Sequence, residues 1–417
     1  MSNKVLVIRN FYLYLQILIT THNFSMKLHF PEGFIIGTST AAYQIETASD
    51  NNWKGLKCRD GSIFDQCSQH DLHRDEDLEY ICQLGNAYRM SHDWAKLQKA
   101  PFADFDKKEV DAYLKFMEEL KRRGKHIMLV LHHFTNPTWF EKEGGWEKEG
   151  NRKMWLDFVQ KSVDTFGHLV DTWNTFNEPN VYVSNGWITG EFPPFKKGKI
   201  LLARKVLKEI SNAHEEAYDI IKQKSNAPIG ISFNMVQFKG EIFPGHLFAK
   251  IADWWFNEYC HNHFLKVDFQ GLSYYAKMSF RPFPLDNINH TEQLKKLGRR
   301  TDLMWEIDPS GFYTMFQRYW KKTKKPIIIT ESGICTHDPK VRKESIKEYL
   351  GFVHKAQQEG IPIKGYFHWS TMDNHEWNIG QYYRFGLVSV DFATGKRTMT
   401  EAGTFLGEVA RNNFVEV

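Results

Sequence analysis

Apolar residues along this chain gather in short β-branched or aromatic runs, and longer stretches with helical spacing separate these runs. Eight of the runs predict β-strands, because their composition and length fit strands better than helices. They span residues 33–39, 86–91, 126–134, 169–178, 228–235, 268–275, 325–333 and 363–372. Strands that alternate with helices are typical of βα units, so we expect a parallel sheet.

Three of the intervening stretches show the helical pattern clearly. Residues 106–123 repeat apolar side chains every three or four positions, and Gly124 follows where such a helix would end. Residues 151–166 begin with Asn151, a residue type that caps helices. Residues 342–359 also stop before a glycine. The side chains that we expect on the buried faces of the first two helices are Val110, Tyr113, Leu114, Met117, Leu120, Trp155, Phe158, Val159 and Phe166.

Eight strands with helical crossovers predict an α/β fold, a single (β/α)8 barrel formed by residues 26–417. Barrels of this kind often exceed the usual length of one domain, so 417 residues are compatible with it. We interpret residues 1–25 as an N-terminal extension before a natural start at Met26. The alternative is a weak signal peptide, because two basic residues precede an apolar run of about ten residues.

Composition narrows the function classes. The net charge of +4 is spread over the chain, so we expect neither a nucleic acid nor a membrane as partner. The 13 Trp residues suit the faces of sugar rings, although Trp also fills cores. Five cysteines without a CxxC pair favour a reducing, cytoplasmic compartment over a disulfide framework or a zinc site. We expect no metal and no cofactor, since HExxH-type pairing is absent from the sequence.

Polar side chains follow the carboxyl ends of all eight predicted strands, the edge where barrels carry their chemistry. Glu178 and Glu331 follow the fourth and seventh strands, so they lie across the barrel and can face one bound sugar. Arg89 is the single arginine of the set. The other candidates at these ends are Gln44, His132, His133, Asn177, Asn234, Tyr275, Trp369 and Glu376. Paired carboxyl groups are what glycosidic cleavage requires, one as a proton donor and one as a nucleophile or base.

Several long motifs resemble glycoside hydrolase family 1, the β-glucosidase family. They include "TFNEP", "ITESG", "GTSTAAYQIE", "LHHFTNPTWF", "DFQGLSYY" and "FHWSTMDNHEWNIGQYYRFGLVSVD". Their order is that of the family, and the resemblance extends from Phe30 to the C-terminus. It implies a retaining β-glycosidase that acts on a small β-glycoside or short oligosaccharide.

The resemblance also implies a role for each candidate residue. Glu178 would be the general acid/base and Glu331 the nucleophile, with their carboxyl groups roughly 5–5.5 Å apart. Arg89 and Tyr275 would support Glu331, and Asn177 would hydrogen-bond the sugar 2-OH. The residues expected to bind substrate are Gln44, His133, Asn234, Trp305, Trp369, Glu376 and Trp377.

The chain departs from the family pattern at Phe134, Ser273, Ser332 and His375, and none of these changes removes a charged catalytic group. The segment between Asn234 and Asp268 is short for the family, so we expect a more open entrance.

Three other functions stay open at this point. A 6-phospho-β-glycosidase would usually have Ser at the place of Glu376 and Lys near that of Tyr383. A non-catalytic sugar-binding barrel would be expected to lose one carboxylate. Transglycosylation would use the same residues as hydrolysis. The sequence does not predict the oligomeric state or a preference among glucose, galactose and fucose.

Overall fold

The computed structural model describes residues 26–65, 67–280 and 301–417. The expected N-terminal extension, residues 1–25, lies outside the described residues. Within the three described ranges, no helix is both long enough and apolar enough to span a bilayer.

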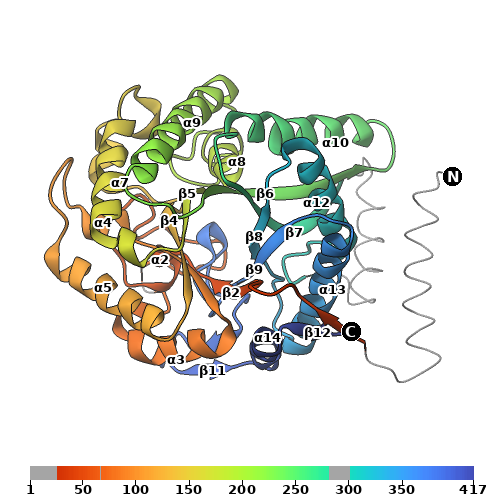
Figure 1. Ribbon diagram of the computed structural model, residues 1–417. Helices are drawn as coiled ribbons and strands as arrows, with labels where there is room; N and C mark the ends of the chain where they lie inside the picture. The colour runs from red at the N-terminus through yellow and green to blue at the C-terminus, as the bar shows by residue number, and fades with distance from the viewer. Residues whose placement is uncertain (1–25, 66, 281–300) are drawn as a thin grey trace.

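Eight parallel strands close into a barrel in chain order, and helices surround it (Figure 1). The ring closes where the last strand pairs with the first, with Ile36 opposite Tyr366. The predicted (β/α)8 fold and all eight predicted strands are therefore confirmed. The barrel strands are β2 (Ile35–Ser39), β3 (Ala87–Ser91), β4 (His126–His132), β5 (Thr172–Asn177), β6 (Ile229–Gly240), β7 (Phe269–Phe280), β8 (Ile327–Ser332) and β9 (Ile363–Trp369).

The α-helices around the barrel differ widely in length. They are α2 (Ala42–Ile45), α3 (Arg74–Leu84), α4 (Trp94–Leu97), α5 (Lys107–Arg122), α6 (Thr138–Lys142), α7 (Arg152–Phe166), α8 (Pro179–Val183), α9 (Ile200–Lys222), α10 (Gly245–Asp253), α12 (Pro309–Thr323), α13 (Pro339–Gln358) and α14 (Glu401–Asn412). Single-turn 3₁₀ and π-helical segments lie between them: η1 (His70–Leu72), η2 (Gly145–Glu147), η3 (Gly167–Leu169), η4 (Ser184–Thr189), η5 (Trp254–Tyr259), η6 (His261–His263) and η7 (Trp377–Ile379).

Two predicted helix ends are confirmed and one predicted cap is wrong. Gly124 and Gly360 follow α5 and α13 with φ of 71° and 81°, the left-handed region where glycine has no steric penalty. Asn151 does precede α7, but its side chain does not cap that helix. Its Nδ2 instead donates to the carbonyl oxygens of Glu143 and Gly145, so the side chain fixes the preceding turn.

A small cluster of apolar side chains from five of the strands fills part of the inside of the barrel. Ala87, Met128, Phe269, Ile328 and Phe367 form a buried apolar cluster that is separate from the larger core between strands and helices. Side chains two residues further along a strand point to the same face. In the regular strands β3 and β9, the residues two positions after Ala87 and Phe367 are Arg89 and Trp369, which therefore point to the inside of the barrel near its carboxyl end.

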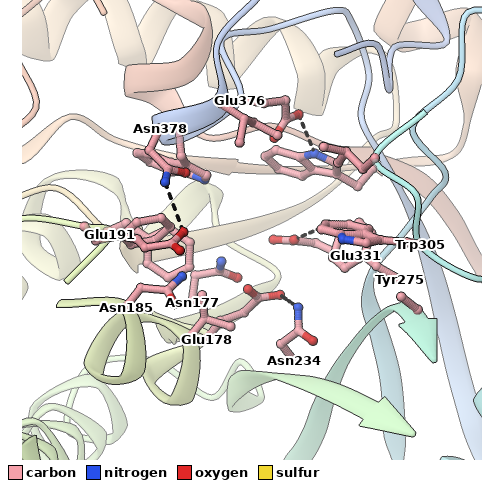
Figure 2. A pocket seen from close by; sticks show the side chains of 18 of the residues that line it. Asn177, Glu178, Asn185, Glu191, Asn234, Tyr275, Trp305, Glu331, Glu376 and Asn378 are labelled. Atoms are coloured by element: carbon pink, nitrogen blue, oxygen red, sulfur yellow. Dashed lines mark hydrogen bonds between the residues drawn. The ribbon is translucent and has the colours of Figure 1, made fainter. Parts of the chain in front are cut away.

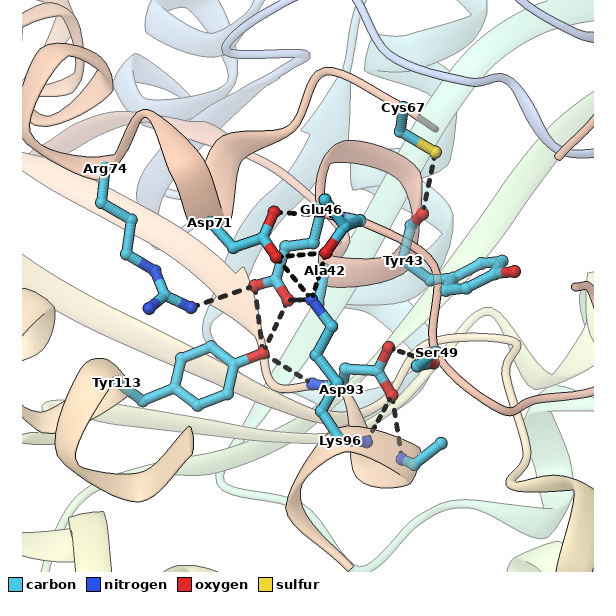
Figure 3. Close-up of polar contacts among 12 residues, drawn as sticks. Ala42, Tyr43, Glu46, Ser49, Cys67, Asp71, Arg74, Asp93, Lys96 and Tyr113 are labelled. Atoms are coloured by element: carbon cyan, nitrogen blue, oxygen red, sulfur yellow. Dashed lines mark hydrogen bonds and ion pairs between the residues drawn. The ribbon is translucent and has the colours of Figure 1, made fainter. Parts of the chain in front are cut away.

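A buried network of charged groups anchors the segment after β2, which carries Gln44 (Figure 3). Lys96 Nζ donates to Glu46 Oε2 at 2.8 Å and to Asp71 Oδ2 at 3.0 Å. Tyr113 Oη donates to Glu46 at 3.0 Å. Burial opposes the charge of Lys96, but the surrounding carboxylates outweigh it and raise the pKa of this lysine. The network therefore ties the loops after β2 and β3 together on the carboxyl side of the barrel.

Four short strands that the described residues form outside the barrel were not predicted. β1 (Lys27–His29) pairs antiparallel with β12 (Phe414–Glu416), so the two ends of the described chain meet. β10 (Val388–Val390) and β11 (Arg397–Met399) form a hairpin. Strands of three residues carry too little apolar pattern to be recognised from sequence.

Candidate active site

A cavity of about 430 Å³ opens at the carboxyl ends of the barrel strands (Figure 2). Arg89 and Gln44 are fully buried and are not among its lining residues. His132 also lies outside the lining, and its ring contacts Asn136 Oδ1 at 2.9 Å. The remaining predicted site residues all line the cavity: His133, Asn177, Glu178, Asn234, Tyr275, Trp305, Glu331, Trp369, Glu376 and Trp377.

Glu331 reaches the cavity because β8 is irregular at its end. Leu272 pairs with Ile329, but the next residue of β7, Ser273, pairs with Glu331. The extra residue is a bulge at Thr330, and such bulges redirect the side chains that follow. The bulge explains why Glu331, three residues after the inward-facing Ile328, still points into the barrel mouth.

Two donors hold the Glu331 carboxylate. Arg89 Nη1 donates to Oε1 at 2.6 Å, and Tyr275 Oη donates to Oε2 at 2.6 Å. Burial raises the pKa of Glu331, while the charge of Arg89 and the Tyr275 hydrogen bond lower it and offset part of that effect.

Glu178 occupies the turn between β5 and α8. Its φ of 43° is unusual for a residue with a side chain, and Pro179 begins the helix directly after it. Asn234 Nδ2 donates to Glu178 Oε1 at 3.2 Å. Burial and the nearby Glu331 raise the pKa of Glu178 well above its ordinary value, and hydrogen bonds from Ser273 and Asn234 offset only part of this. Figure 2 shows both carboxyl groups turned into the same cavity.

Arg89 links Glu331 to the amide beside Glu178. Its Nη2 donates to Asn177 Oδ1 at 2.6 Å. Burial and the charge of Arg89 hold the pKa of His133 well below its ordinary value, so the ring is neutral. Asn177 Nδ2 can therefore donate to His133 Nε2, 3.0 Å away. This chain of contacts fixes the Asn177 amide against the cavity.

Two serines complete the setting of Arg89: Ser39 belongs to the motif "GTSTAAYQIE", whereas Ser232 belongs to none of the family-like motifs. Ser39 Oγ accepts from Nη1 at 2.7 Å, and Ser232 Oγ accepts from Nη2 at 3.2 Å. Ser39 is the last residue of β2 and Ser232 is an inner residue of β6, so Arg89 is held from several strands at once.

A third carboxyl group, Glu376, lines the opposite part of the cavity. Trp369 Nε1 donates to Glu376 Oε1 at 3.1 Å, and Gln44 Nε2 approaches Oε2 at 3.4 Å. Burial raises the pKa of Glu376 to about 7. The Gln44 amide also donates to Asn374 and to the carbonyl oxygen of His375, so Gln44 fastens the loop that carries Glu376.

The departures from the family pattern have different surroundings. His375 faces away from the cavity: its ring lies 3.1 Å from Cys58 Sγ, and burial lowers its pKa to about 4. Phe134 lines the cavity and packs against Trp377 with ring centroids 5.1 Å apart. Ser273 is more important than the sequence suggested, because it hydrogen-bonds the Glu178 carboxyl. Ser332 is fully buried at the end of β8.

The outer part of the cavity has two unlike sides. One side is polar, with Arg59 Nη2 at 2.5 Å from Glu191 Oε2 and Asn378 Nδ2 at 3.2 Å from the same oxygen. The other side is apolar, with Val236, Phe256 and Met278 among its residues. Within the described ranges, no group of three or more His, Cys, Asp or Glu side chains is placed to hold a metal ion.

Comparison with known proteins identifies the family. The model of glycosyl hydrolase family 1 matches residues 26–240 and 259–415. The chain belongs to this family. It is 28% identical to β-glucosidase A of Thermotoga maritima, over 93% of this chain and 99% of that protein. It is 27% identical to a 6-phospho-β-galactosidase of Clostridium acetobutylicum, over 88% of this chain and 94% of that protein.

A solved structure of a β-glycosidase from Pyrococcus horikoshii superposes on this fold with a TM-score of 0.84. Its sequence is 31% identical, and the match covers 94% of this chain and 97% of that one. The family 1 chain described here is thus a glycoside hydrolase, a retaining β-glycosidase, and the resemblance noted from its motifs is confirmed.

Proposed function

We propose that this family 1 chain removes terminal non-reducing β-D-glucosyl residues, or their galactosyl or fucosyl counterparts, with Glu331 as nucleophile and Glu178 as general acid/base. The supporting observation is the asymmetry between two buried carboxyl groups that face one cavity. Arg89 and Tyr275 donate to Glu331, whereas Glu178 receives only neutral donors and feels the charge of Glu331. The group with the more strongly raised pKa keeps the proton, and the other stays ionised.

In the first step, a carboxylate oxygen of Glu331 attacks the anomeric carbon while the bond to the leaving oxygen breaks. Glu178 transfers its proton to that oxygen, so the aglycone departs as a neutral alcohol. The product is a glycosyl ester of Glu331. Direct attack requires the separation of roughly 5–5.5 Å expected from the sequence, which stays a prediction.

In the second step, water enters on the side that the aglycone has left. Glu331 is now an uncharged ester, so the charge that raised the pKa of Glu178 has gone. The Glu178 carboxylate takes a proton from water as the oxygen attacks the anomeric carbon. Release of Glu331 restores both starting states, and two inversions give a product with retained β configuration.

The glycone would bind in the inner part of the cavity. The Asn177 amide, oriented by Arg89 and His133, is available to hydrogen-bond the sugar 2-OH. Glu376 offers carboxyl oxygens to the hydroxyls at the far side of the ring, and Trp369 offers an aromatic face below it. We assign the other predicted substrate contacts to Gln44, His133, Asn234, Trp305 and Trp377.

A 6-phospho-glycoside fits this cavity less well, although the relative from Clostridium acetobutylicum is named a 6-phospho-β-galactosidase. Among the described residues that line the cavity, Arg59 is the only one with a permanent positive charge, and Glu191 neutralises it. Glu376 would also repel a phosphate whenever it is ionised. For location we propose the cytoplasm, since the five cysteines are free thiols, as is usual in a reducing compartment.

The test is hydrolysis of 4-nitrophenyl β-glucoside by the wild type and by two variants. Glu331→Gln should lower kcat by at least about a thousandfold, because no covalent ester can form. Glu178→Ala should lose less on this substrate, since nitrophenolate leaves without a proton. The loss for Glu178→Ala should be much larger on an alkyl β-glucoside, whose leaving group needs protonation.

Glu408→Gln, on the exposed side of α14, is the matched control and should leave every rate unchanged. Near-normal turnover by Glu331→Gln would overturn the nucleophile assignment. If the wild type hydrolysed no aryl β-glycoside, the proposed function itself would fail.

A further inference from the structure

One wall of the outer cavity is a two-stranded ribbon, the part of β6 and β7 that extends beyond the closed barrel. β6 and β7 stay paired beyond the barrel, as far as Gly240 and Phe280. The sequence predicted both strands to end about five residues earlier, near 235 and 275. Val236, Ala276 and Met278 of this extension line the cavity, so the wall they form is apolar.

A bulge turns this part of β7 toward the cavity. Met235 pairs with Tyr274 and Gln237 pairs with Lys277, so β7 has one residue more than β6 between these pairs. Consecutive residues of a regular strand point to opposite faces, yet Tyr275 and Ala276 both line the cavity. The bulge thus lets Tyr275 reach Glu331 while the residues after it present an apolar surface to the same space.

Further apolar side chains complete the wall. Phe256 comes from η5, within the segment 241–258 that the family model does not match, and it also lines the cavity. Leu303 and Trp305 line it as well. Met278 is 43% exposed and Met304, beside Trp305, is 41% exposed. The apolar surface therefore continues from the buried part of the cavity out to solvent.

The polar side chains on the other side of the outer cavity already hydrogen-bond one another. Arg59 and Asn378 both donate to Glu191, and Glu191 N donates to the carbonyl oxygen of Asn185. A second sugar ring would have to compete with these contacts. An apolar group would instead cover Met278 and Phe256 without breaking any hydrogen bond, and removal of their surface from water favours that binding.

We propose that the aglycone site takes an apolar group, so that the preferred substrates are β-glycosides of long-chain alcohols rather than β-linked oligosaccharides. This inference rests on the proposed function, because the sugar must first be seated between Glu178 and Glu331. The chain would leave the cavity along Met278 and Phe256, with Trp305 beside the first carbons after the glycosidic oxygen.

The test compares kcat/KM for methyl, butyl and octyl β-D-glucoside and for cellobiose, with the alkyl glucosides below their micelle concentrations. Partial burial of each methylene should raise kcat/KM about twofold, so octyl, with four more methylenes, should exceed butyl by about fifteenfold. Cellobiose should fall below octyl glucoside. In Met278→Asp, the octyl-to-methyl ratio should drop about fivefold or more, because a carboxylate would stand in the apolar path.

Met278→Gln keeps the length of the side chain and should lower the same ratio to a smaller extent. Leu201→Asp is the control, since Leu201 is an exposed apolar residue on α9 outside the cavity lining, and it should leave the ratio unchanged. Equal kcat/KM for all alkyl glucosides, or a preference for cellobiose, would overturn the proposal. Intact hydrolysis of 4-nitrophenyl β-glucoside beside either result would leave the proposed function standing, whereas its absence would remove both.

Discussion

Glu178, Glu331 and Glu376 all line the inner cavity, and their neighbours give each a different character. Glu331 accepts hydrogen bonds from Arg89 and Tyr275. Burial and the charge of Glu331 raise the pKa of Glu178, and burial raises the pKa of Glu376 to about 7. All three are nearly inaccessible to solvent, so burial alone does not distinguish them. The partners decide which group donates a proton, which attacks and which binds.

The hydroxyl of Tyr275 offers a direct test of this division. Tyr275→Phe removes a hydrogen bond to the ionised Glu331, so the pKa of Glu331 should rise. The free enzyme needs Glu331 ionised, and activity therefore falls as pH drops through this pKa. The acid limb of the pH profile of kcat/KM should move to higher pH, and the maximum should fall about tenfold or more.

The basic limb reports the proton on Glu178 and should move less, since Tyr275 does not donate to that group. The measurement is kcat/KM for an aryl β-glucoside between pH 4 and pH 9. A uniform loss of activity with both limbs in place would show that Tyr275 acts only through packing.

At the level of elements, sequence patterns were sufficient for the order of the barrel and insufficient for its strand ends. The eight strands and the helix ends at Gly124 and Gly360 follow from apolar periodicity and glycine placement. The bulges at Thr330 and at Tyr275–Ala276 do not, because buried parallel strands are apolar on both faces and show no alternation in which one extra residue could be seen. These bulges orient the side chains of Glu331 and Tyr275, so the orientation of these two residues could not be predicted from the sequence.

The site residues themselves divide in the same way. Ten predicted residues line the cavity because strand ends of a barrel meet at one edge. Ser39, Ser232 and Ser273 were missed as contributors, since a serine becomes important only through the atom it faces. The extension of β6 and β7 was missed because tertiary pairing prolongs strands that have a weak apolar pattern.

The turn from β6 into α10 gives a prediction about the extension. A methyl group on Gly245 would lie 2.5 Å from the carbonyl oxygen of Phe280, so α10 would have to move away from the ribbon. Gly245→Ala should lower stability by about 1–3 kcal/mol, and it should reduce kcat/KM for octyl glucoside more than for methyl glucoside. Thermal unfolding and the alkyl series measure the two effects.

Gly351→Ala is a matched control within α13. A methyl group there meets nothing within 4 Å, so the better helix propensity of alanine should raise stability by about 1 kcal/mol with no change in substrate preference. Equal stability changes for the two variants would contradict the close approach at Gly245.

Over the whole molecule, the pairing of the chain ends and the catalytic cavity lie at opposite ends of the barrel. The carboxyl ends of the strands carry buried charges and the left-handed Glu178, features that cost stability in exchange for reactivity. The strand β1 precedes the amino end of β2, and its pairing with β12 joins the two ends of the described chain there. Leu28 faces Val415 across this pair.

Because of this separation, we expect Val415→Asp to lower the free energy of unfolding without changing kcat/KM of the folded enzyme. Val415 is fully buried, so an aspartate would place an unpaired carboxylate among apolar side chains and lower the free energy of unfolding by about 3 kcal/mol or more. Leu265→Asp, at an exposed apolar position, should change the melting temperature little. At 25 °C, kcat/KM per folded molecule should match the wild type in both variants, because the site depends on strand ends that neither residue contacts. A loss of kcat/KM in folded Val415→Asp, out of proportion to the folded fraction, would mean that the strand ends depend on the closure between β1 and β12.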